Sequence, residues 1–273
     1  MKTIIIIICI ISYLLVRFIL NTKNNIDINH QILPFGYQYD KNIRTNTKDD
    51  FYILLKKYGN NDDIKLTNKI LNITHTYPPT WGIKIDKNNK VEFEMYFYVY
   101  NPGTRKYEKD AITINKLNEL FNKKEYVYDN HTMHSIDYHD MNNEPNIYYF
   151  TSSDNIKDVG YSKRNNKLNN YYYRYLPSTI DEKFLKYIDT NLINYNLGKN
   201  IKSVFIADKL IRNYYGVYYD GVSYNQLEYF MRKYNYSLDY IKDLDKTKAY
   251  SILVDFNKEN DNIERIGIFG ILI

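Results

Sequence analysis

The chain of 273 residues is poor in cysteine: its one cysteine, Cys9, lies in an apolar stretch near the amino terminus. The rest of the chain can therefore form neither a disulfide nor a cysteine-based metal site. Neither basic nor acidic residues are in large excess. Of 37 basic residues, Lys2, Arg17 and Lys23 precede the first acidic residue, which leaves 34 against 32 acidic residues, a balance of +2. A nearly neutral domain argues against bulk electrostatic binding of nucleic acid.

Glycine and proline are scarce as well, with ten and six residues. No glycine-rich phosphate loop, nucleophile elbow or dinucleotide fingerprint occurs, so no motif specifies a reaction or a cofactor. No linker rich in glycine, proline or serine divides the chain. We therefore expect residues 48–273 to form a single domain.

The longest apolar stretch runs from Ile4 to Leu20 and contains one charged residue, Arg17. As a helix it would span about 25 Å, against a hydrocarbon core of about 30 Å. We expect a single-pass membrane anchor over residues 1–22, with the membrane as a partner of residues 4–20, and a polar juxtamembrane stalk over residues 23–47. A cleaved signal peptide is the alternative, but no small-residue cleavage site follows the stretch. The flanking charges slightly favour an amino terminus in the cytosol.

Tyrosine is abundant, with 32 residues, while alanine occurs three times. Isoleucine, asparagine, lysine and tyrosine all have codons rich in A and T, a bias typical of AT-rich genomes such as those of some large viruses and protists. The tyrosine clusters are therefore weak indications of a binding surface. The glycosylation sequons at Asn72, Asn130 and Asn235 occur about as often as chance predicts and do not show that the domain is lumenal.

Hydrophobic periodicity predicts a domain of alternating strands and helices. Helices are expected over residues 48–58, 63–71, 114–123, 177–192 and 223–234. Thr47 can cap the first, Glu182 completes a capping box in the fourth, and Ser223 with Gln226 opens the last. Period-two alternation predicts strands over residues 80–86, 91–100, 146–151, 171–176, 204–209, 214–220, 249–256 and 263–272. The predicted fold class is α+β: a transmembrane helix, then a mainly antiparallel sheet built from repeated strand-strand-helix units. That sheet is either open or closed into a helix-wrapped barrel.

The clearest candidate for a chemical site is the pair Glu92 and Glu94. Two residues apart on a strand, their side chains leave the same face about 7 Å apart, a separation suited to acid and base roles or to metal binding. In an open sheet this face meets water. In a closed barrel it lines a polar interior, where a cluster could be completed by Lys84, Asp86, Arg174, Asp208, Asp220 and Asp255.

A second candidate is the stretch from Asp129 to Asp140, which holds His131, His134 and His139. Imidazole and carboxylate groups are suitable zinc ligands, but the spacing matches no zinc signature. We interpret the stretch as a polar surface loop, and the basic run from Lys163 to Lys167 in the same way.

The sequence therefore favours a binding or structural module as the function. The alternative is an enzyme whose polar pocket lies on the Glu92/Glu94 face inside a closed antiparallel barrel, and a metal-dependent hydrolase is a third hypothesis. These hypotheses differ in whether the two carboxylates are buried in a cavity.

Overall fold

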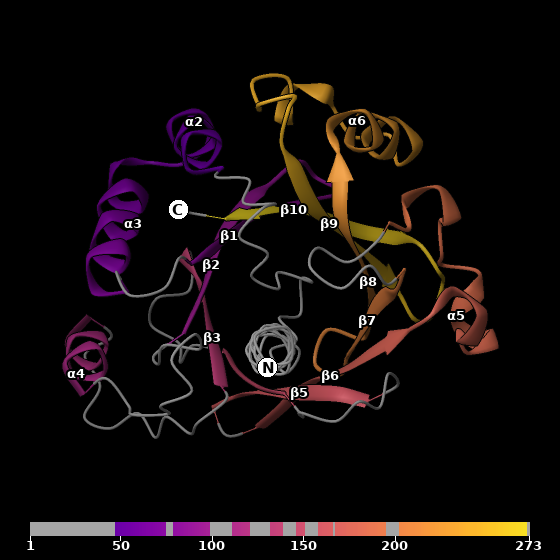
Figure 1. Ribbon diagram of the computed structural model, residues 1–273, viewed down its shortest axis with the longest axis horizontal. Helices are drawn as coiled ribbons and strands as arrows, with labels where there is room; N and C mark the ends of the chain where they lie inside the picture. The colour runs from indigo at the N-terminus through magenta and orange to yellow at the C-terminus, as the bar shows by residue number, and fades with distance from the viewer. Residues whose placement is uncertain are drawn as a thin grey trace, which may run out of the picture.

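The computed structural model describes residues 47–74, 79–98, 111–120, 132–138, 146–150, 158–165, 167–194 and 202–271. Within these residues, ten antiparallel strands form a closed barrel (Figure 1). Each strand pairs with its neighbours in sequence, and the first closes the ring by pairing with the last. The strands are β1 (Thr80–Asp86), β2 (Val91–Tyr98), β3 (Thr132–Asp137), β4 (Asn146–Phe150), β5 (Asp158–Arg164), β6 (Lys167–Tyr175), β7 (Val204–Lys209), β8 (Tyr214–Ser223), β9 (Ala249–Asn257) and β10 (Ile263–Ile271).

The helices that the structure describes lie outside the barrel wall (Figure 1). They are α2 (Lys48–Tyr58), α3 (Asn61–Ile73), α4 (Ala111–Leu120), α5 (Glu182–Leu185) and α6 (Tyr224–Lys233). Short 3-10 turns follow the strands at η3 (Pro177–Thr179) and η4 (Thr190–Leu192), and η5 (Leu238–Tyr240) follows α6. Because the turns after β1, β5, β7 and β9 are short while helices follow β2, β6 and β8, the barrel has two different ends. We call the end with the short turns the hairpin end.

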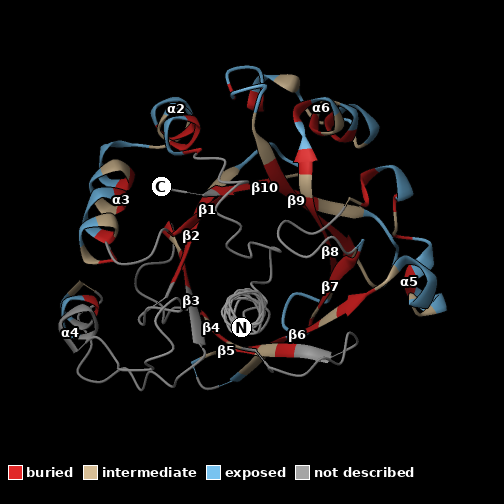
Figure 2. Cartoon of the chain, viewed as in Figure 1, coloured by how far each residue is buried: buried red, intermediate tan, exposed pale blue. Residues whose placement is uncertain are grey.

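The apolar core lies between the outer face of the barrel and the helices. Alternate residues of the strands face outward and are buried there, among them Trp81, Ile83 and Phe93. The helices contribute a buried stripe that includes Phe51 and Leu227. Figure 2 shows the consequence, with buried positions along the strands and on the barrel side of the helices. Period-two alternation therefore places the intervening residues of each strand in the lumen.

The structure corrects the predicted α+β fold class. The chain is a closed ten-stranded antiparallel β-barrel with few helices, not a sheet of regularly repeated strand-strand-helix units. The helix expected over residues 177–192 is two 3-10 turns around the four-residue α5, although Glu182 was predicted to complete a capping box. The cause of the error is that apolar residues spaced three or four apart also occur in irregular segments packed on a barrel wall.

The predicted single-pass membrane localisation is also corrected. Among the residues that the structure describes, no helix has the length and apolar character needed to cross a bilayer. The predicted anchor, residues 1–22, and all of the predicted stalk except Thr47 lie outside the described residues. The assignment of the chain as a single-pass membrane protein therefore has no structural support.

Strands β3 and β5 were not predicted from the sequence, because many of their residues are polar. β3 lies within the histidine-containing stretch interpreted as a loop, and β5 ends in the basic run from Lys163. On β3 the lumen-facing positions include Ser135 and Asp137, whereas Ile136 faces the outer core. A strand that lines a polar lumen has no apolar inner face, so its sequence resembles a loop.

Other local predictions are confirmed. The hairpin of β1 and β2 forms as expected, and α6 begins with the predicted capping box of Ser223 and Gln226. Helix α2 also forms, but the hydroxyl of Thr47 does not cap it. That oxygen instead accepts a hydrogen bond of 2.8 Å from the indole nitrogen of Trp81, which ties the start of α2 to the barrel wall.

Candidate functional site

A ring of aromatic side chains crosses the middle of the lumen. Neighbouring members have ring centroids 5.7 to 6.2 Å apart, and the circuit closes on itself. All six are buried. The members, in order around the barrel, are Tyr96, Tyr148, Tyr172, Phe205, Tyr218 and Phe269. Gly82 makes room for the last of these, because a Cβ there would lie 2.5 Å from its ring.

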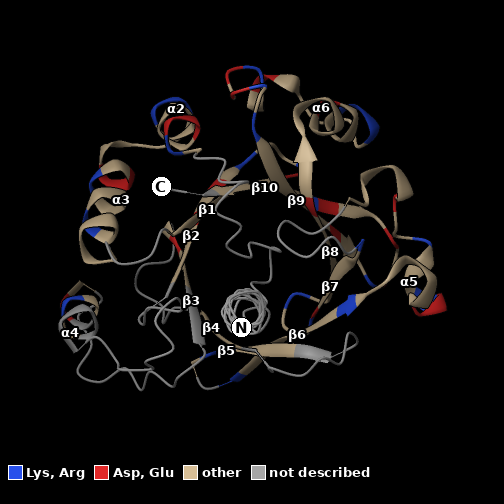
Figure 3. Cartoon of the chain, viewed as in Figure 1, with Lys and Arg blue, Asp and Glu red and all other residues tan. Residues whose placement is uncertain are grey.

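Between this ring and the hairpin end lies a charged layer made of ion pairs. Glu94 pairs with Lys84 and accepts a hydrogen bond of 2.7 Å from the hydroxyl of Tyr96. Burial raises the pKa of Glu94, although its two donors act in the opposite direction. Asp137 lies 3.4 Å from Arg164. Figure 3 shows acidic and basic positions on several strands of the barrel, where an apolar core would have none.

The best-buried part of the charged layer is a carboxylate between two cations. Asp255 has no exposed surface; one of its oxygens accepts a hydrogen bond of 2.5 Å from Lys209 Nζ, and the other accepts one from Arg265 Nε. Although burial favours the neutral acid, the two cations lower the pKa of Asp255 to about 2. Burial lowers the pKa of Lys209 to about 7. Gly216 leaves the space for this pair, because a Cβ there would lie 2.7 Å from the carboxylate.

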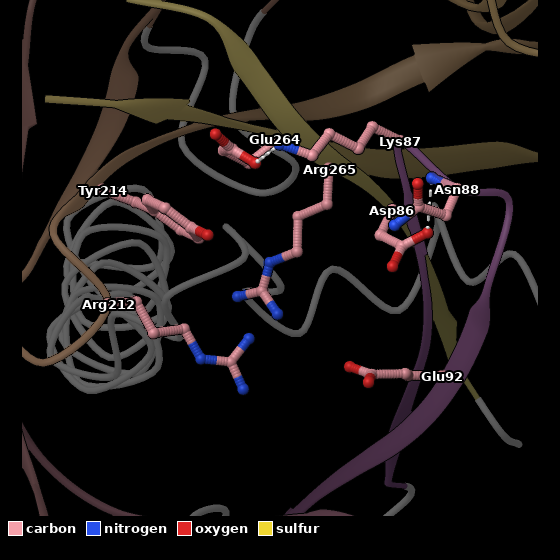
Figure 4. A pocket seen from close by; sticks show the side chains of 8 residues that line it. All are labelled: Asp86, Lys87, Asn88, Glu92, Arg212, Tyr214, Glu264 and Arg265. Atoms are coloured by element: carbon pink, nitrogen blue, oxygen red, sulfur yellow. Dashed lines mark hydrogen bonds and ion pairs between the residues drawn. The ribbon is translucent and has the colours of Figure 1, made fainter. Parts of the chain in front are cut away.

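A pocket of about 180 Å³ opens at the hairpin end. We call it the mouth pocket, and Figure 4 shows its lining. Two of its side chains pair with each other, since Lys87 Nζ lies 2.9 Å from the carboxylate of Glu264. The lining residues are Asp86, Lys87, Asn88, Glu92, Arg212, Tyr214, Glu264 and Arg265.

Two guanidinium groups of the mouth pocket point into the same space (Figure 4). Arg265 comes from β10 and is 6% exposed, with its Nε held by Asp255. Arg212 comes from the exposed turn between β7 and β8. Among the described residues, no ion pair or hydrogen bond joins Arg212 to an acidic side chain. The two like charges therefore face each other with no described carboxylate paired to Arg212.

Glu92 lies across the pocket from both guanidinium groups (Figure 4). Its Oε1 accepts a hydrogen bond of 2.9 Å from Lys90, whose side chain is 62% exposed. Burial acts to raise its pKa, but the positive charges of Lys90, Arg212 and Arg265 outweigh burial and lower it. Glu92 is therefore ionised at neutral pH.

On the other side of the aromatic ring, the lumen holds a second buried pair of opposite charge. Asp220 accepts a hydrogen bond of 2.8 Å from Ser251, and burial raises its pKa to about 7. Arg174 is 8% exposed, and its Nε has no hydrogen-bond partner among the described residues. Burial lowers the pKa of Arg174, with the charge of Asp220 acting in the opposite direction.

The structure brings most of the sequence-predicted polar cluster into the lumen. Lys84 and Glu94 pair there, Asp255 joins the charged layer, Arg174 and Asp220 lie beyond the aromatic ring, and Asp86 lines the mouth pocket. The exception is Asp208, which lies on the outward face of β7 and pairs with Lys258. Glu92 and Glu94 separate: Glu92 lines the mouth pocket, and Glu94 does not.

Among the site residues that sequence reasoning missed are the basic residues Lys209, Arg212 and Arg265. Lys209 and Arg265 lie on correctly predicted strands, so period-two alternation could have placed both on the polar face. Their meeting at Asp255 depends on closure of the barrel. Arg212 lies in a turn, where no periodic signal exists.

The histidine stretch is only partly described. His134 lies on β3, where it pairs with Phe97 of β2 and Ile147 of β4, whereas His131 and His139 lie outside the described residues. Within the described part of the chain, no three residues of the types His, Cys, Asp and Glu form a group suited to a metal ion. The metal hypothesis for the three histidines stays a prediction.

The fold and the mouth pocket thus define the chain as a closed antiparallel barrel with a charged interior. Comparison with known proteins adds no relative, since no protein-family model and no curated protein matches the sequence.

Proposed function

We propose that the protein is a binding module that holds a small oxyanion, a carboxylate or a phosphate, in the mouth pocket. The observation that carries this proposal is the convergence of the Arg212 and Arg265 guanidinium groups from separate elements (Figure 4). Two like charges that face each other repel, and an oxyanion between them would reverse the sign of that interaction. Guanidinium groups also match the geometry of carboxylate and phosphate oxygens.

Arg265 supports the proposal because its surroundings orient it. Its Nε is bonded to Asp255, a carboxylate that stays ionised at neutral pH, so the plane of the guanidinium group is fixed. The terminal amino groups of Arg265 are then directed to the pocket at little entropic cost on binding. The side chain is buried, so its interaction with an anion is less screened by solvent than that of a surface arginine.

Binding is favoured over the enzyme hypothesis by the separation of the two glutamates. An acid and a base that act on one molecule must both reach it. Glu92 faces the pocket, whereas Glu94 is 2% exposed and bonded to Lys84 and Tyr96. A molecule in the mouth pocket therefore contacts only one member of the pair. The pocket volume of about 180 Å³ suits a ligand of a few heavy atoms.

Isothermal titration calorimetry of the full chain with acetate and with inorganic phosphate tests the proposal. We expect one bound anion per chain for at least one of the two probes. Arg212→Gln should weaken that binding about tenfold or more, the effect of losing a hydrogen bond between charged groups. Arg232→Gln is the matched control, because Arg232 is an exposed arginine on α6 outside the pocket. No binding of either anion, or equal binding by the two variants, would contradict the proposal.

A further inference from the structure

The walls of the mouth pocket carry opposite charges. The guanidinium groups of Arg212 and Arg265 occupy one side, and the carboxylates of Asp86 and Glu92, from β1 and β2, lie on the other (Figure 4). Lys87 and Glu264 neutralise each other in an ion pair. A ligand with only a negative charge would satisfy the basic side and face the acidic one.

The acidic side has oxygens that its neighbours leave open. Asp86 uses Oδ1 to accept the backbone N–H groups of Asn88 and Lys90, at 2.8 and 2.9 Å, while Oδ2 has no hydrogen-bond partner among the described residues. Glu92 uses Oε1 to accept from Lys90, and within the described part of the chain Oε2 likewise has no donor. Each carboxylate thus presents one free acceptor.

A metal ion is a poor occupant for these acceptors. A divalent cation beside Glu92 would also lie beside two guanidinium groups, whose repulsion opposes its binding. An ammonium group carries one charge, donates three hydrogen bonds and, when it is joined to an oxyanion, brings the compensating negative charge with it.

We propose that the ligand of the mouth pocket is dipolar, with an amino group a few bonds from its carboxylate or phosphate. This inference rests on the proposed oxyanion site and names the chemical class of its ligand: amino acids and aminoalkyl phosphates. The oxyanion lies between Arg212 and Arg265, and the ammonium group donates to Glu92 and Asp86. Glu92 thereby selects against anions that lack the amine.

Matched pairs of probes separate the two ends of the ligand. The full chain is titrated with glycine and acetate, β-alanine and propionate, and 4-aminobutyrate and butyrate; within each pair only the amino group differs. We expect at least one amino acid to bind about tenfold more tightly than its partner, the effect of a hydrogen bond between charged groups. Glu92→Gln should remove that difference while the plain carboxylate binds as well as before or better. Arg212→Gln should weaken both members of the pair.

Glu182→Gln is the control, since Glu182 is exposed and lies on α5 outside the pocket. Glu92 is only half-buried at the rim, so its variant should fold, and an unchanged melting temperature would verify this. If plain carboxylates bind at least as tightly as every amino acid, the dipolar inference is wrong and the oxyanion proposal stands. If none of these probes binds, the dipolar inference is wrong; if inorganic phosphate fails to bind as well, so is the oxyanion proposal.

Discussion

The Asp255→Asn substitution should destabilise the barrel strongly, and the reason lies in its two partners. The variant keeps the size of the side chain and removes the charge that Lys209 and Arg265 share. The side chains of these cations are 6% and 8% exposed, so water cannot replace the lost carboxylate. Removing one partner of a buried ion pair costs about 3 to 5 kcal/mol. That is a large part of the typical total stability of about 5 to 15 kcal/mol.

The pH dependence of this loss follows from Lys209. Its pKa of about 7 in the native protein should fall further in the variant, because Asp255 is the carboxylate that supports its charge. At a pH between the lowered pKa of Lys209 in the folded variant and its pKa of about 7 in the folded wild type, the folded variant has lost this proton. The unfolded variant keeps it, so the stability of the variant rises with pH. Wild-type Lys209 keeps its proton over this range in both states. The loss caused by Asp255→Asn should therefore shrink as the pH rises towards 7.

Urea unfolding, followed by circular dichroism, measures these differences. Asp208→Asn is the matched control, because its ion pair with Lys258 lies on the outer face and its side chains are more exposed, at 18% and 20%, so its loss should cost less. Adding Lys209→Met to Asp255→Asn should recover part of the loss, with a coupling energy of about 1 to 3 kcal/mol. Equal losses for the two asparagine variants, or no recovery in the double variant, would refute the view that Asp255 neutralises buried cations.

Two further predictions concern other buried positions. Asp220 has a pKa of about 7, raised from 3.8 by burial, so the unfolded chain loses this proton first and wild-type stability should fall as the pH rises from about 4 to 7. Asp220→Asn keeps an acceptor for Ser251 and should flatten that decline in urea titrations; an unchanged decline would mean that Asp220 is not its source. Gly270→Ala should cost about 1 to 3 kcal/mol, measured by thermal unfolding, because its Cβ would lie 2.2 Å from the Thr47 hydroxyl. An unchanged melting temperature would show that α2 does not pack this closely.

Local patterns in the sequence correctly predicted several elements of the barrel wall. The alternation in Thr80–Asp86 and Val91–Tyr98 predicted the first hairpin and placed Phe93 in the core and Glu94 on the opposite face. The capping box at Ser223 predicted the start of α6. These predictions succeed because side-chain periodicity and caps act over a few residues.

The prediction of the candidate site was partial for the same reason. Glu92 was recognised because it alternates with apolar residues on a strong strand. Arg212 and Arg265 were not recognised, since a turn has no period and the partners of a lumen residue lie on other strands. Lys209 and Asp255 are 46 residues apart and come from strands that do not pair directly.

Closure of the barrel was decided only by the tertiary structure. The sequence determined which face of each strand with clear period-two alternation is apolar, because an apolar face is buried away from water in any stable fold. It could not determine whether the opposite, polar face meets solvent or a lumen, since charged and tyrosine side chains suit either. Pairing of β1 with β10 made that choice, and it joins Thr80 to Ile271, 191 residues further along the chain. Closure buried the polar face that would meet solvent in an open sheet, so its charged residues form buried ion pairs, and it placed Glu92 opposite two arginines.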